Sequence, residues 1–289
     1  MAGSSTPLRR LGTELRRLRG TTGRTQVDVG EAIGRTHATL VNWERGKTKI
    51  SKSDLVCLLA ELDAPAEVRA ELEKLRDEAG RGAGQWAIYG LPDWLRSLVN
   101  FEEDAVAITT FEPVIVPDLL QTEEYAHATH VAAPHVVTPS AVTKWVDARM
   151  QRQQRLTSPD PLRLHAVICE SVLRLEVGGP AGMTAQLEQL LDAANTDNVT
   201  IQVLPAIQAA HVGVANNFTV LHFADPATDP PLGYFNGPFG GYMISDEGDV
   251  ASMVTMFDVL RRPALDAAAS VEMLAGILGE YRRKGGDHV

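Results

Sequence analysis

A short polar and basic stretch near the N-terminus has the chemistry needed to bind nucleic acid. His37 and Asn42 carry side chains that can hydrogen-bond to base edges, and Arg45, Lys47 and Lys49 supply positive charge close behind them. Asparagine can bind adenine through two hydrogen bonds, whereas arginine and lysine neutralise phosphates. The spacing therefore predicts a surface on which base-reading residues are followed by phosphate-binding ones.

Two short helices joined by a tight turn would present this surface. Thr25 is suited to cap a helix over residues 26–33, and Thr36 is suited to cap a second helix over residues 37–45. Gly34 lies between them and can adopt the positive φ that ends the first helix. These signals predict the boundaries of both helices.

The second helix separates an inward face from an outward one. Leu40 and Trp43 are three residues apart and point into a core, together with Val29 from the first helix. The outward face holds three candidates for base contacts, which are His37, Ala38 and Asn42. The candidates for phosphate contacts lie at the helix starts and beyond the second helix, and are Gln26, Thr36, Arg45, Lys47 and Lys49.

This arrangement is the helix-turn-helix plan, in which the second helix enters the major groove. An ordinary helical hairpin within a core is the alternative interpretation. The stretch resembles the phage-repressor type of DNA-binding domain, also called the xenobiotic-response-element repressor family. Eight positions carry the resemblance: Gln26, Gly34, Thr36, Leu40, Trp43, Glu44, Gly46 and Lys47. The resemblance implies an all-α, five-helix domain over residues 1–79 that binds double-stranded operator DNA, and we expect it to act as a homodimer.

The distribution of charge agrees with DNA contact by the N-terminal region alone. The chain has 289 residues and a net charge of −10. Residues 1–50 hold ten Arg and Lys against four Asp and Glu, a net of +6, so the rest carries −16. A basic region attached to an acidic one is expected when only the basic part contacts phosphate.

The remainder of the chain is expected to form a second, larger domain. The run GRGAG at residues 80–84 predicts a flexible linker and a domain boundary. Beyond it, strand-like segments alternate with helical ones, and the clearest strands are 106–111, 162–170, 199–204 and 218–223. Residues 85–289 are therefore predicted to form a mixed α/β domain that dimerises and binds an effector or a partner.

This second region is similar to a long C-terminal domain of unknown role in actinobacterial, antitoxin-like regulators. Four segments carry the resemblance: FEPVIVPDLLQTEEYA, ARMQRQ, ESVLRLEVGG and VTIQVLP. The motif PDLLQTEEYA at residues 117–126 is the most specific, although Asp118 stands where glycine is usual, and Asn236 stands where an acid is commoner. The resemblance implies a regulator that responds to a small effector, or one that binds a small cognate protein and represses their shared promoter.

An arginine pair and an aromatic group are the candidates for an effector or partner site. Arg149 and Arg152 lie three apart on one predicted helix and could bind a carboxylate or phosphate, with a salt bridge to the domain's own acids as the alternative. The aromatic group could line a pocket or pack in a core, and comprises Phe218, Phe223, Tyr234, Phe235, Phe239 and Tyr242. The predicted site combines Arg149, Arg152, Tyr234 and Tyr242.

Catalytic and metal-binding patterns are weak. His130 and His135 are five residues apart, but no nearby side chain completes a set of metal ligands. Cys169, Glu170 and His165 could suggest a nucleophile and a base, but no glycine-rich elbow or oxyanion loop accompanies them. We therefore expect no catalysis, metal or cofactor, and an enzyme with a DNA-binding domain is the rival class.

The two cysteines bear on the compartment. Cys57 and Cys169 lie in apolar runs, which predicts buried thiols in a reducing cytosol. The N-terminus has no apolar signal core, and no segment approaches the ~18 apolar residues of a membrane span. We expect a soluble, cytoplasmic protein without a membrane partner.

Overall fold

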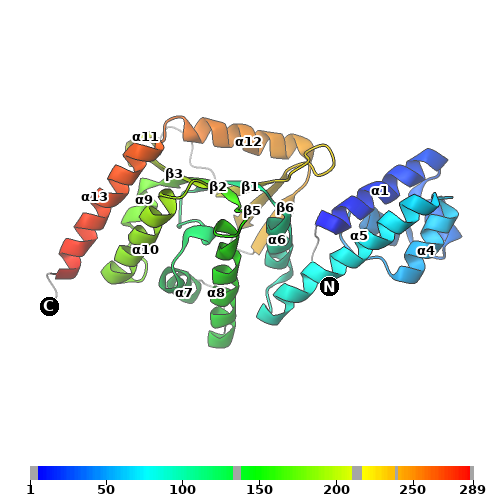
Figure 1. Ribbon diagram of the computed structural model, residues 1–289, viewed down its shortest axis with the longest axis horizontal. Coiled ribbons are helices and arrows are strands. Elements are labelled where there is room, and N and C mark those ends of the chain that lie inside the picture. The colour runs from blue at the N-terminus through cyan, green and yellow to red at the C-terminus, as the bar shows by residue number, and fades with distance from the viewer. Residues whose placement is uncertain (1–5, 133–137, 210–216, 238–239, 287–289) are drawn as a thin grey trace. The chain divides into compact units, whose positions relative to one another are not determined.

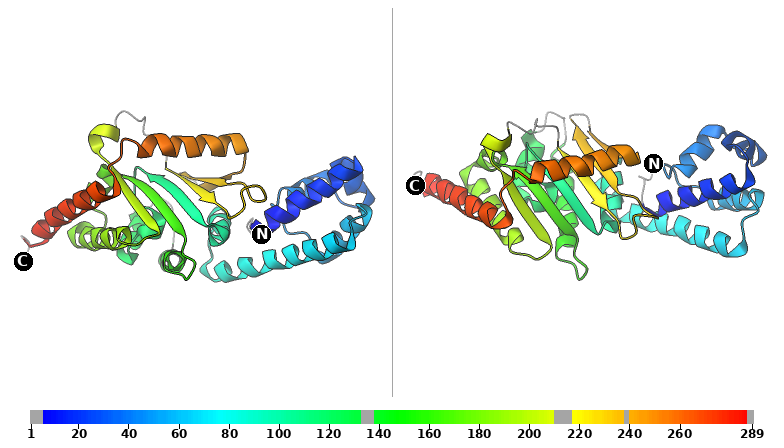
Figure 2. Two further views of the ribbon diagram at one scale, coloured as in Figure 1. Left: turned by 45° about the horizontal axis from the view of Figure 1, so that its top comes forward. Right: turned by 90° about the horizontal axis from the view of Figure 1, so that it is seen from above.

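The computed structural model describes residues 6–132, 138–209, 217–237 and 240–286. Contacts within the chain divide it into two compact units. The N-terminal unit comprises Met1–Asp104 with Ala227–Asp229, and the C-terminal unit comprises Ala105–Pro226 with Pro230–Val289. The first is built on helices and the second on a six-stranded sheet flanked by helices (Figures 1 and 2). This confirms the predicted fold class.

The helices of the N-terminal unit begin where the capping residues predict. Their bounds are α1 Thr6–Thr22, α2 Gln26–Ala32, α3 His37–Glu44, α4 Lys52–Glu61 and α5 Ala66–Gln85. The hydroxyl groups of Thr25, Thr36 and Ser51 accept hydrogen bonds from backbone N–H groups in the first turns of α2, α3 and α4. Each cap satisfies a donor that the helix itself leaves free.

The turn between α2 and α3 depends on two glycines. Gly34 has a φ of 68°, a left-handed conformation that side chains other than glycine rarely adopt. Gly30 lies within α2, and a Cβ at this position would stand 3.0 Å from the carbonyl oxygen of Arg35. The absence of a side chain there lets the chain entering α3 pass close to α2.

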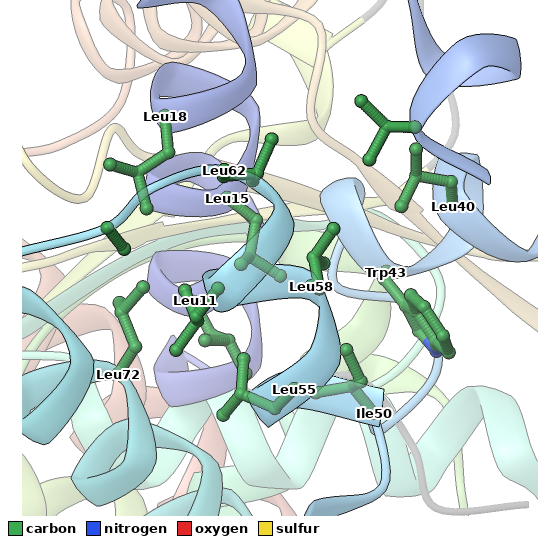
Figure 3. Close-up of a cluster of buried hydrophobic side chains, with 13 residues drawn as sticks. Leu11, Leu15, Leu18, Leu40, Trp43, Ile50, Leu55, Leu58, Leu62 and Leu72 are labelled. Atoms are coloured by element: carbon green, nitrogen blue, oxygen red, sulfur yellow. The ribbon is translucent and has the colours of Figure 1, made fainter. Parts of the chain in front are cut away.

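One hydrophobic cluster joins these helices (Figure 3). Leu40 and Trp43 of α3 are 1% and 6% exposed, so the predicted inner face of this helix is confirmed. They pack with residues from the other four helices and the intervening turns, which are Leu11, Leu15, Leu18, Val29, Ile50, Leu55, Leu58, Leu59, Leu62, Ala64 and Leu72. This shared core fixes the orientation of α3.

The structure differs from the predicted linker at residues 80–84. These residues belong to the last turns of α5, and the unit continues through a 3₁₀ helix, Trp86–Tyr89, and α6, Asp93–Asp104. Each glycine costs a helix only about 1 kcal/mol, and no proline interrupts the hydrogen bonds before the helix ends. The boundary between units therefore falls after Asp104.

The sheet of the C-terminal unit has the order β3-β2-β1-β4-β5-β6. Its strands are β1 Ala107–Glu112, β2 Arg163–Cys169, β3 Val199–Leu204, β4 Phe218–His222, β5 Leu232–Gly237 and β6 Gly240–Ile244. The first three are parallel to one another, while β4, β5 and β6 continue the sheet with antiparallel pairing. All four predicted strands are present.

Helices cover both faces of this sheet (Figures 1 and 2). One face holds α12, Glu247–Arg261, and the other holds α7, α8 and α10, which span Glu123–Ala132, Pro139–Gln153 and Gly179–Ala194. The shorter α9, Glu170–Arg174, follows β2, and α11, Ala206–Ala209, follows β3. The last helix, α13, spans Ala267–Gly286 and packs along α10.

The motif at residues 117–126 forms a turn and then the start of a helix. A short 3₁₀ helix spans Asp118–Leu120, and Gln121 then takes an extended conformation with ψ of 145°. The hydroxyl group of Thr122 accepts a hydrogen bond from the backbone N–H of Tyr125 at the start of α7. Burial of the Gln121 side chain, which donates to the carbonyl oxygen of Val116 at 2.6 Å, favours this break.

One cysteine prediction is wrong. Cys169 is buried as expected, but Cys57 is exposed. Cys57 lies on α4, whose core face is formed by Leu55, Leu58 and Leu59. Because a helix turns 100° with each residue, position 57 points away from that face although its neighbours in sequence are apolar.

Candidate nucleic-acid interface and a buried arginine pair

The three candidates for base contacts lie at the outer face of α3. His37 and Ala38 are exposed, and Asn42 is half-buried. Among the described residues, the Asn42 side chain makes no hydrogen bond. Its amide therefore keeps both its donor and its acceptor for an external partner, which is what bidentate contact with adenine requires.

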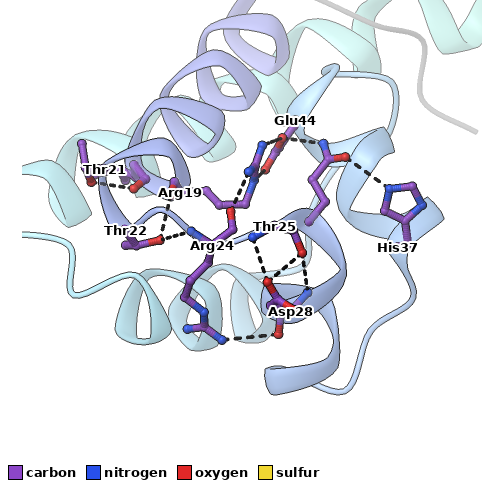
Figure 4. Close-up of polar contacts among 10 residues, drawn as sticks. Arg19, Thr21, Thr22, Arg24, Thr25, Asp28, His37 and Glu44 are labelled. Atoms are coloured by element: carbon purple, nitrogen blue, oxygen red, sulfur yellow. Dashed lines mark hydrogen bonds and ion pairs between the residues drawn. The ribbon is translucent and has the colours of Figure 1, made fainter.

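His37 belongs to a hydrogen-bonded group that we call the Glu44 cluster, formed by Arg19, Gln26, His37 and Glu44; Figure 4 labels Arg19, His37 and Glu44. Arg19 donates from Nε and Nη2 to the two carboxylate oxygens of Glu44, at 2.6 and 3.0 Å. The amide of Gln26 donates to Glu44 at 2.7 Å, and its oxygen lies 3.3 Å from Nε2 of His37. The cluster thus links α1, the start of α2 and both ends of α3.

Burial makes the Glu44 cluster a fixed structure. The Glu44 side chain is 3% exposed and that of Arg19 is 16% exposed. Hydrogen bonding to Glu44 raises the pKa of Arg19 above its ordinary value. The spacing of α3 held a signal for this pair, because Glu44 lies four residues after Leu40 on the buried face and an acid there requires a partner.

The basic residues of the N-terminal unit separate into two kinds. Arg17, Arg19, Arg24 and Arg35 form ion pairs with carboxylates of Glu14, Glu44, Glu61 and Asp54, respectively. In contrast, Arg45, Lys47 and Lys49 have no ion pair within the part of the chain that the structure describes. Arg45 and Lys47 are exposed and Lys49 is half-buried. The cations predicted to bind phosphate thus belong to the kind without an ion pair, as do Arg16 and Lys52 among the described residues.

The two remaining candidates for phosphate contacts have internal roles. Thr36 is exposed, and its hydroxyl group caps α3 by accepting from the backbone N–H of Thr39 at 3.2 Å. Gln26 is half-buried and is held by Glu44 and His37. Both side chains have defined positions at the helix starts before any DNA binds.

The arginine pair of the C-terminal unit lies in a second group, the Asp118 cluster, formed by Glu112, Asp118, Arg149 and Arg152. The two arginines share one carboxylate: Nη2 of Arg149 is 3.2 Å from Oδ1 of Asp118, and Nη1 of Arg152 is 3.1 Å from Oδ2. Arg149 also donates to the Gln121 side chain. A salt bridge to the domain's own acids, the alternative interpretation of this pair, is therefore present.

Glutamine side chains hold the chain around Asp118. Gln153 of α8 donates to the backbone carbonyl oxygens of Asp118 and Gln121, at 3.2 and 2.7 Å. From α10, Gln186 donates to the carbonyl oxygen of Leu120 at 2.7 Å, and Gln189 donates to that of Gln121 at 2.8 Å. The loop Asp118–Gln121 of this motif is thus held by hydrogen bonds from α8 and α10, and we call it the clamped loop.

Burial sets the charges in the Asp118 cluster. Burial and then the nearby Asp118 carboxylate raise the pKa of Glu112 well above its ordinary value. Burial alone would raise the pKa of Asp118 too, but Arg149 and Arg152 outweigh it and lower the pKa. Burial and then Arg149 lower the pKa of neighbouring His130 to about 4. These shifts favour a neutral Glu112 and His130 beside an ionised Asp118.

The structure brings together only three of the four residues of the predicted effector site. Tyr234 of β5 lies near Arg149 and is 6% exposed. Tyr242 of β6 is 56% exposed and stacks on Phe235, with which it is paired across the strands. Because successive residues of a strand point to opposite faces, Tyr242 faces away from Tyr234, and its assignment to the site is wrong.

The weak catalytic and metal patterns form no joint site. His165 bonds the Gln202 side chain at 2.8 Å, while Glu170 starts α9 and pairs with Arg174. Burial raises the pKa of the Cys169 thiol, which disfavours the nucleophilic thiolate. His135 and Phe239 lie outside the described residues. Within the described ranges, no group of three or more His, Cys, Asp or Glu residues could hold a metal.

No helix among the described residues combines the length and apolar character that a bilayer crossing needs.

Comparison with known protein families agrees with these two units. Residues 10–72 match the model of a helix-turn-helix domain, which indicates a DNA-binding regulator. Neither the curated proteins nor the solved structures contain a match to this chain. Residues 95–276 match the model described as a domain of unknown function (DUF5753). As that match covers more than half of the chain, the protein belongs to the DUF5753 family and carries a helix-turn-helix domain ahead of it.

Proposed function

We propose that this protein is a sequence-specific transcription regulator that binds a two-fold operator as a homodimer. The observation that carries the proposal is the outer surface of α3. It combines an asparagine amide without an internal partner, an exposed histidine on a fixed support, and three unpaired cations beyond the helix. The asparagine amide and the histidine ring are suited to read bases, and the cations are suited to bind phosphates.

The homodimer is part of the proposal because one such helix covers one half-site. In helix-turn-helix regulators two recognition helices enter successive major grooves, about 34 Å apart along the duplex. The fixed core around α3 supports a rigid recognition helix of this kind. We assign dimerisation to the C-terminal unit, since the apolar residues of α1–α5 are largely used in their own core.

We further propose that the C-terminal unit controls DNA binding in response to a small effector, and that the chain catalyses no reaction. The buried arginine pair is the feature that supports a ligand-responsive role. The separated positions of His165, Cys169 and Glu170 support the absence of catalysis. A small cognate protein is the alternative stimulus. Mapping the bound sites across the genome separates the two, since a short reading frame beside the strongest site favours the protein partner.

The sharpest test of base reading is Asn42→Ala. The variant should lose preference for one base pair in each half-site, at a cost of about 1–3 kcal/mol in discrimination. Selection of bound sequences from a random library measures this preference. Val41→Ala on the same helix is the control, because it removes no hydrogen-bonding group and should leave the profile unchanged. An Asn42→Ala profile identical to that of the wild type would remove Asn42 from the interface.

A further inference from the structure

Three residues from far along the chain belong to the N-terminal unit. They are Ala227–Asp229, which we call the Asp229 segment, and they lie in the connection between β4 and β5. The chain leaves the C-terminal unit after Pro226 and rejoins it at Pro230. Proline fixes φ at about −65°, so the conformation is restricted at both junctions. The Asp229 segment is therefore a part of the N-terminal unit that stays covalently connected to two strands of the sheet.

The carboxylate of Asp229 holds this segment on α1. The Asp229 side chain is 0% exposed, and two consecutive arginines of α1 pair with it. Arg10 donates from Nε to Oδ2 of the carboxylate, and Nη2 of Arg9 lies 3.6 Å from Oδ1. Burying a carboxylate is costly unless it is paired. The ion pairs with both arginines therefore stabilise the buried position of Asp229.

The same turn of α1 supports the end of the recognition helix. Gly46 follows α3 with a φ of 61°, and a Cβ there would stand 2.8 Å from Cα of Arg9. A Cβ on Gly12 of α1 would stand 2.6 Å from the carbonyl oxygen of Trp43. These distances leave no room for a side chain, so α1 and residues 43–46 meet backbone to backbone.

This packing connects the position of α1 to the surface that is expected to meet DNA. Arg9 contacts Asp229 through its side chain and lies against Gly46 through its backbone. A displacement of Arg9 has to displace Gly46, because Gly46 has no side chain that could absorb the shift. Lys47, a candidate for phosphate contact, comes directly after Gly46. The position of Asp229 therefore bears on the position of Lys47 and of the end of α3.

We propose that Asp229 is a positioning residue for DNA binding. Its carboxylate fixes Arg9 and Arg10 on α1, and α1 in turn fixes residues 43–46 and the orientation of the recognition helix. Because the chain connects Asp229 to β4 and β5, a change in the sheet is transmitted to α3 by this route. The hold on α1 stands independently, whereas its effect on operator binding rests on the function proposed above.

Hydrogen exchange of backbone amides, followed by mass spectrometry on the full-length protein without DNA, tests the hold on α1. In Asp229→Asn, the amides of residues 8–15 and 43–47 should exchange about tenfold faster, because the arginines lose their charged partner and this turn opens more often. Residues 55–72 should keep the wild-type rates. A selective effect of this kind separates positioning from a general loss of stability.

The arginines of α1 supply matched variants for the same measurement. Arg10→Gln should give the pattern of Asp229→Asn, and the double variant should exchange no faster than Asp229→Asn alone, because the two residues belong to one pair. Arg17→Gln is the control on the same helix. Its pair with Glu14 is exposed, so all exchange rates should stay unchanged.

Preference for operator DNA tests the functional consequence. The probe is the duplex that the wild type selects from a random library, compared with a scrambled duplex at the same salt concentration. Asp229→Asn should lose about tenfold of this preference. Taking the ratio cancels the general gain in phosphate attraction that follows the removal of an acid. Arg17→Gln should keep the wild-type ratio.

Several results would overturn the proposal. Faster exchange throughout α1–α5 in Asp229→Asn would mean that Asp229 only stabilises the unit, and unchanged rates would mean that it does not hold α1. Wild-type operator preference alongside faster exchange at residues 43–47 would remove its role in DNA binding. If Asp229→Asn does not fold, Arg10→Gln against Arg17→Gln decides both measurements. A wild type that prefers no DNA sequence would end the proposed function, while the hold on α1 would still be read from exchange.

Discussion

The Glu44 cluster and the Asp118 cluster both pair arginine with a carboxylate. In the Glu44 cluster one arginine pairs with the carboxylate, whereas in the Asp118 cluster two arginines share it. In the N-terminal unit, one carboxylate receives both donors of one arginine and a glutamine amide. In the C-terminal unit, one carboxylate is shared by two arginines, and burial raises the pKa of a second acid, Glu112. The first arrangement is balanced and holds a recognition helix in position. The second joins α8 to the loop at Asp118, because both arginines come from that helix.

The first prediction disrupts the Glu44 cluster. Glu44→Ala leaves the Arg19 guanidinium partly buried without its partner, and it frees Gln26. Removing one member of a buried ion pair should lower the free energy of unfolding by about 3 kcal/mol. Urea denaturation measures this loss. Glu14→Ala removes an exposed pair with Arg17 and should cost less than about 1 kcal/mol, so equal losses in the two variants would contradict a structural role for Glu44.

The second prediction removes the central carboxylate of the Asp118 cluster. Asp118→Asn removes the charged carboxylate that two buried guanidinium groups share and should cost about 2 kcal/mol of unfolding free energy, less than Glu44→Ala because water reaches Asp118. Adding Arg149→Gln should recover part of this loss, since it removes one of the two guanidinium groups that paired with this carboxylate. A double variant less stable than the sum of both single changes would show that the arginines do not repel each other.

The same variant has a defined pH dependence. The folded state lowers the pKa of Asp118, so its ionised carboxylate contributes stability above the unfolded pKa of about 3.9. That contribution is lost as the pH falls through the lower, folded-state pKa. The difference in stability between wild type and Asp118→Asn should thus be full near neutral pH and shrink on acidification below about pH 4. A constant difference across that range would mean that charge is not the cause.

The third prediction tests whether the unpaired cations are the ones that meet DNA. Lys47→Ala should weaken binding to all sequences alike, by about 1 kcal/mol, and reduce the salt slope of the binding constant by about one. Lys74→Ala is the matched control, because Lys74 is exposed on α5 and is 3.8 Å from Glu78. Fluorescence anisotropy over a salt series measures both. The same slope for Lys47→Ala and the wild type would exclude this phosphate contact.

The prediction with the smallest expected effect tests whether Gln26 positions His37. Gln26→Leu keeps the ion pair between Arg19 and Glu44 but removes the hydrogen bond that reaches the imidazole ring. Discrimination at the base pair read by His37 should fall by about 0.5–1 kcal/mol, the value of one neutral hydrogen bond. The bound-sequence profile measures it. A loss of preference at Asn42's base pair instead would show that the whole helix has moved.

Most of the N-terminal fold follows from local signals in the sequence. Thr25, Thr36 and Gly34 determine helix ends through contacts with residues nearby in the chain, so their effects can be predicted without knowledge of the tertiary structure. The pair between Arg19 and Glu44 was missed because its members are 25 residues apart. An acid on an apolar helix face indicates that a partner exists but does not identify it.

The C-terminal unit was harder to predict because its site depends on distant pairing. Alternating residues predicted the strands, but the placement of β1 between β2 and β4 required the sheet itself. The arginine pair could be found by its spacing on a helix, whereas Asp118 could be identified as its partner only from the folded loop. Tyr242 was assigned wrongly because the β5–β6 pairing, which determines the face of each aromatic ring, has no local signature.

The clamped loop has a consequence for how this family can diversify. Neutral glutamine amides hold the backbone around Asp118, so the residue at position 118 can be exchanged while the path of the chain is kept. A single nucleotide change converts an aspartate codon to one for asparagine, glycine or alanine. Each such step would remove the carboxylate that the arginines share and leave the arginines and the supporting glutamines in place. Position 118 is thus where one mutation can change the charge beside the arginine pair while the path of the loop is kept.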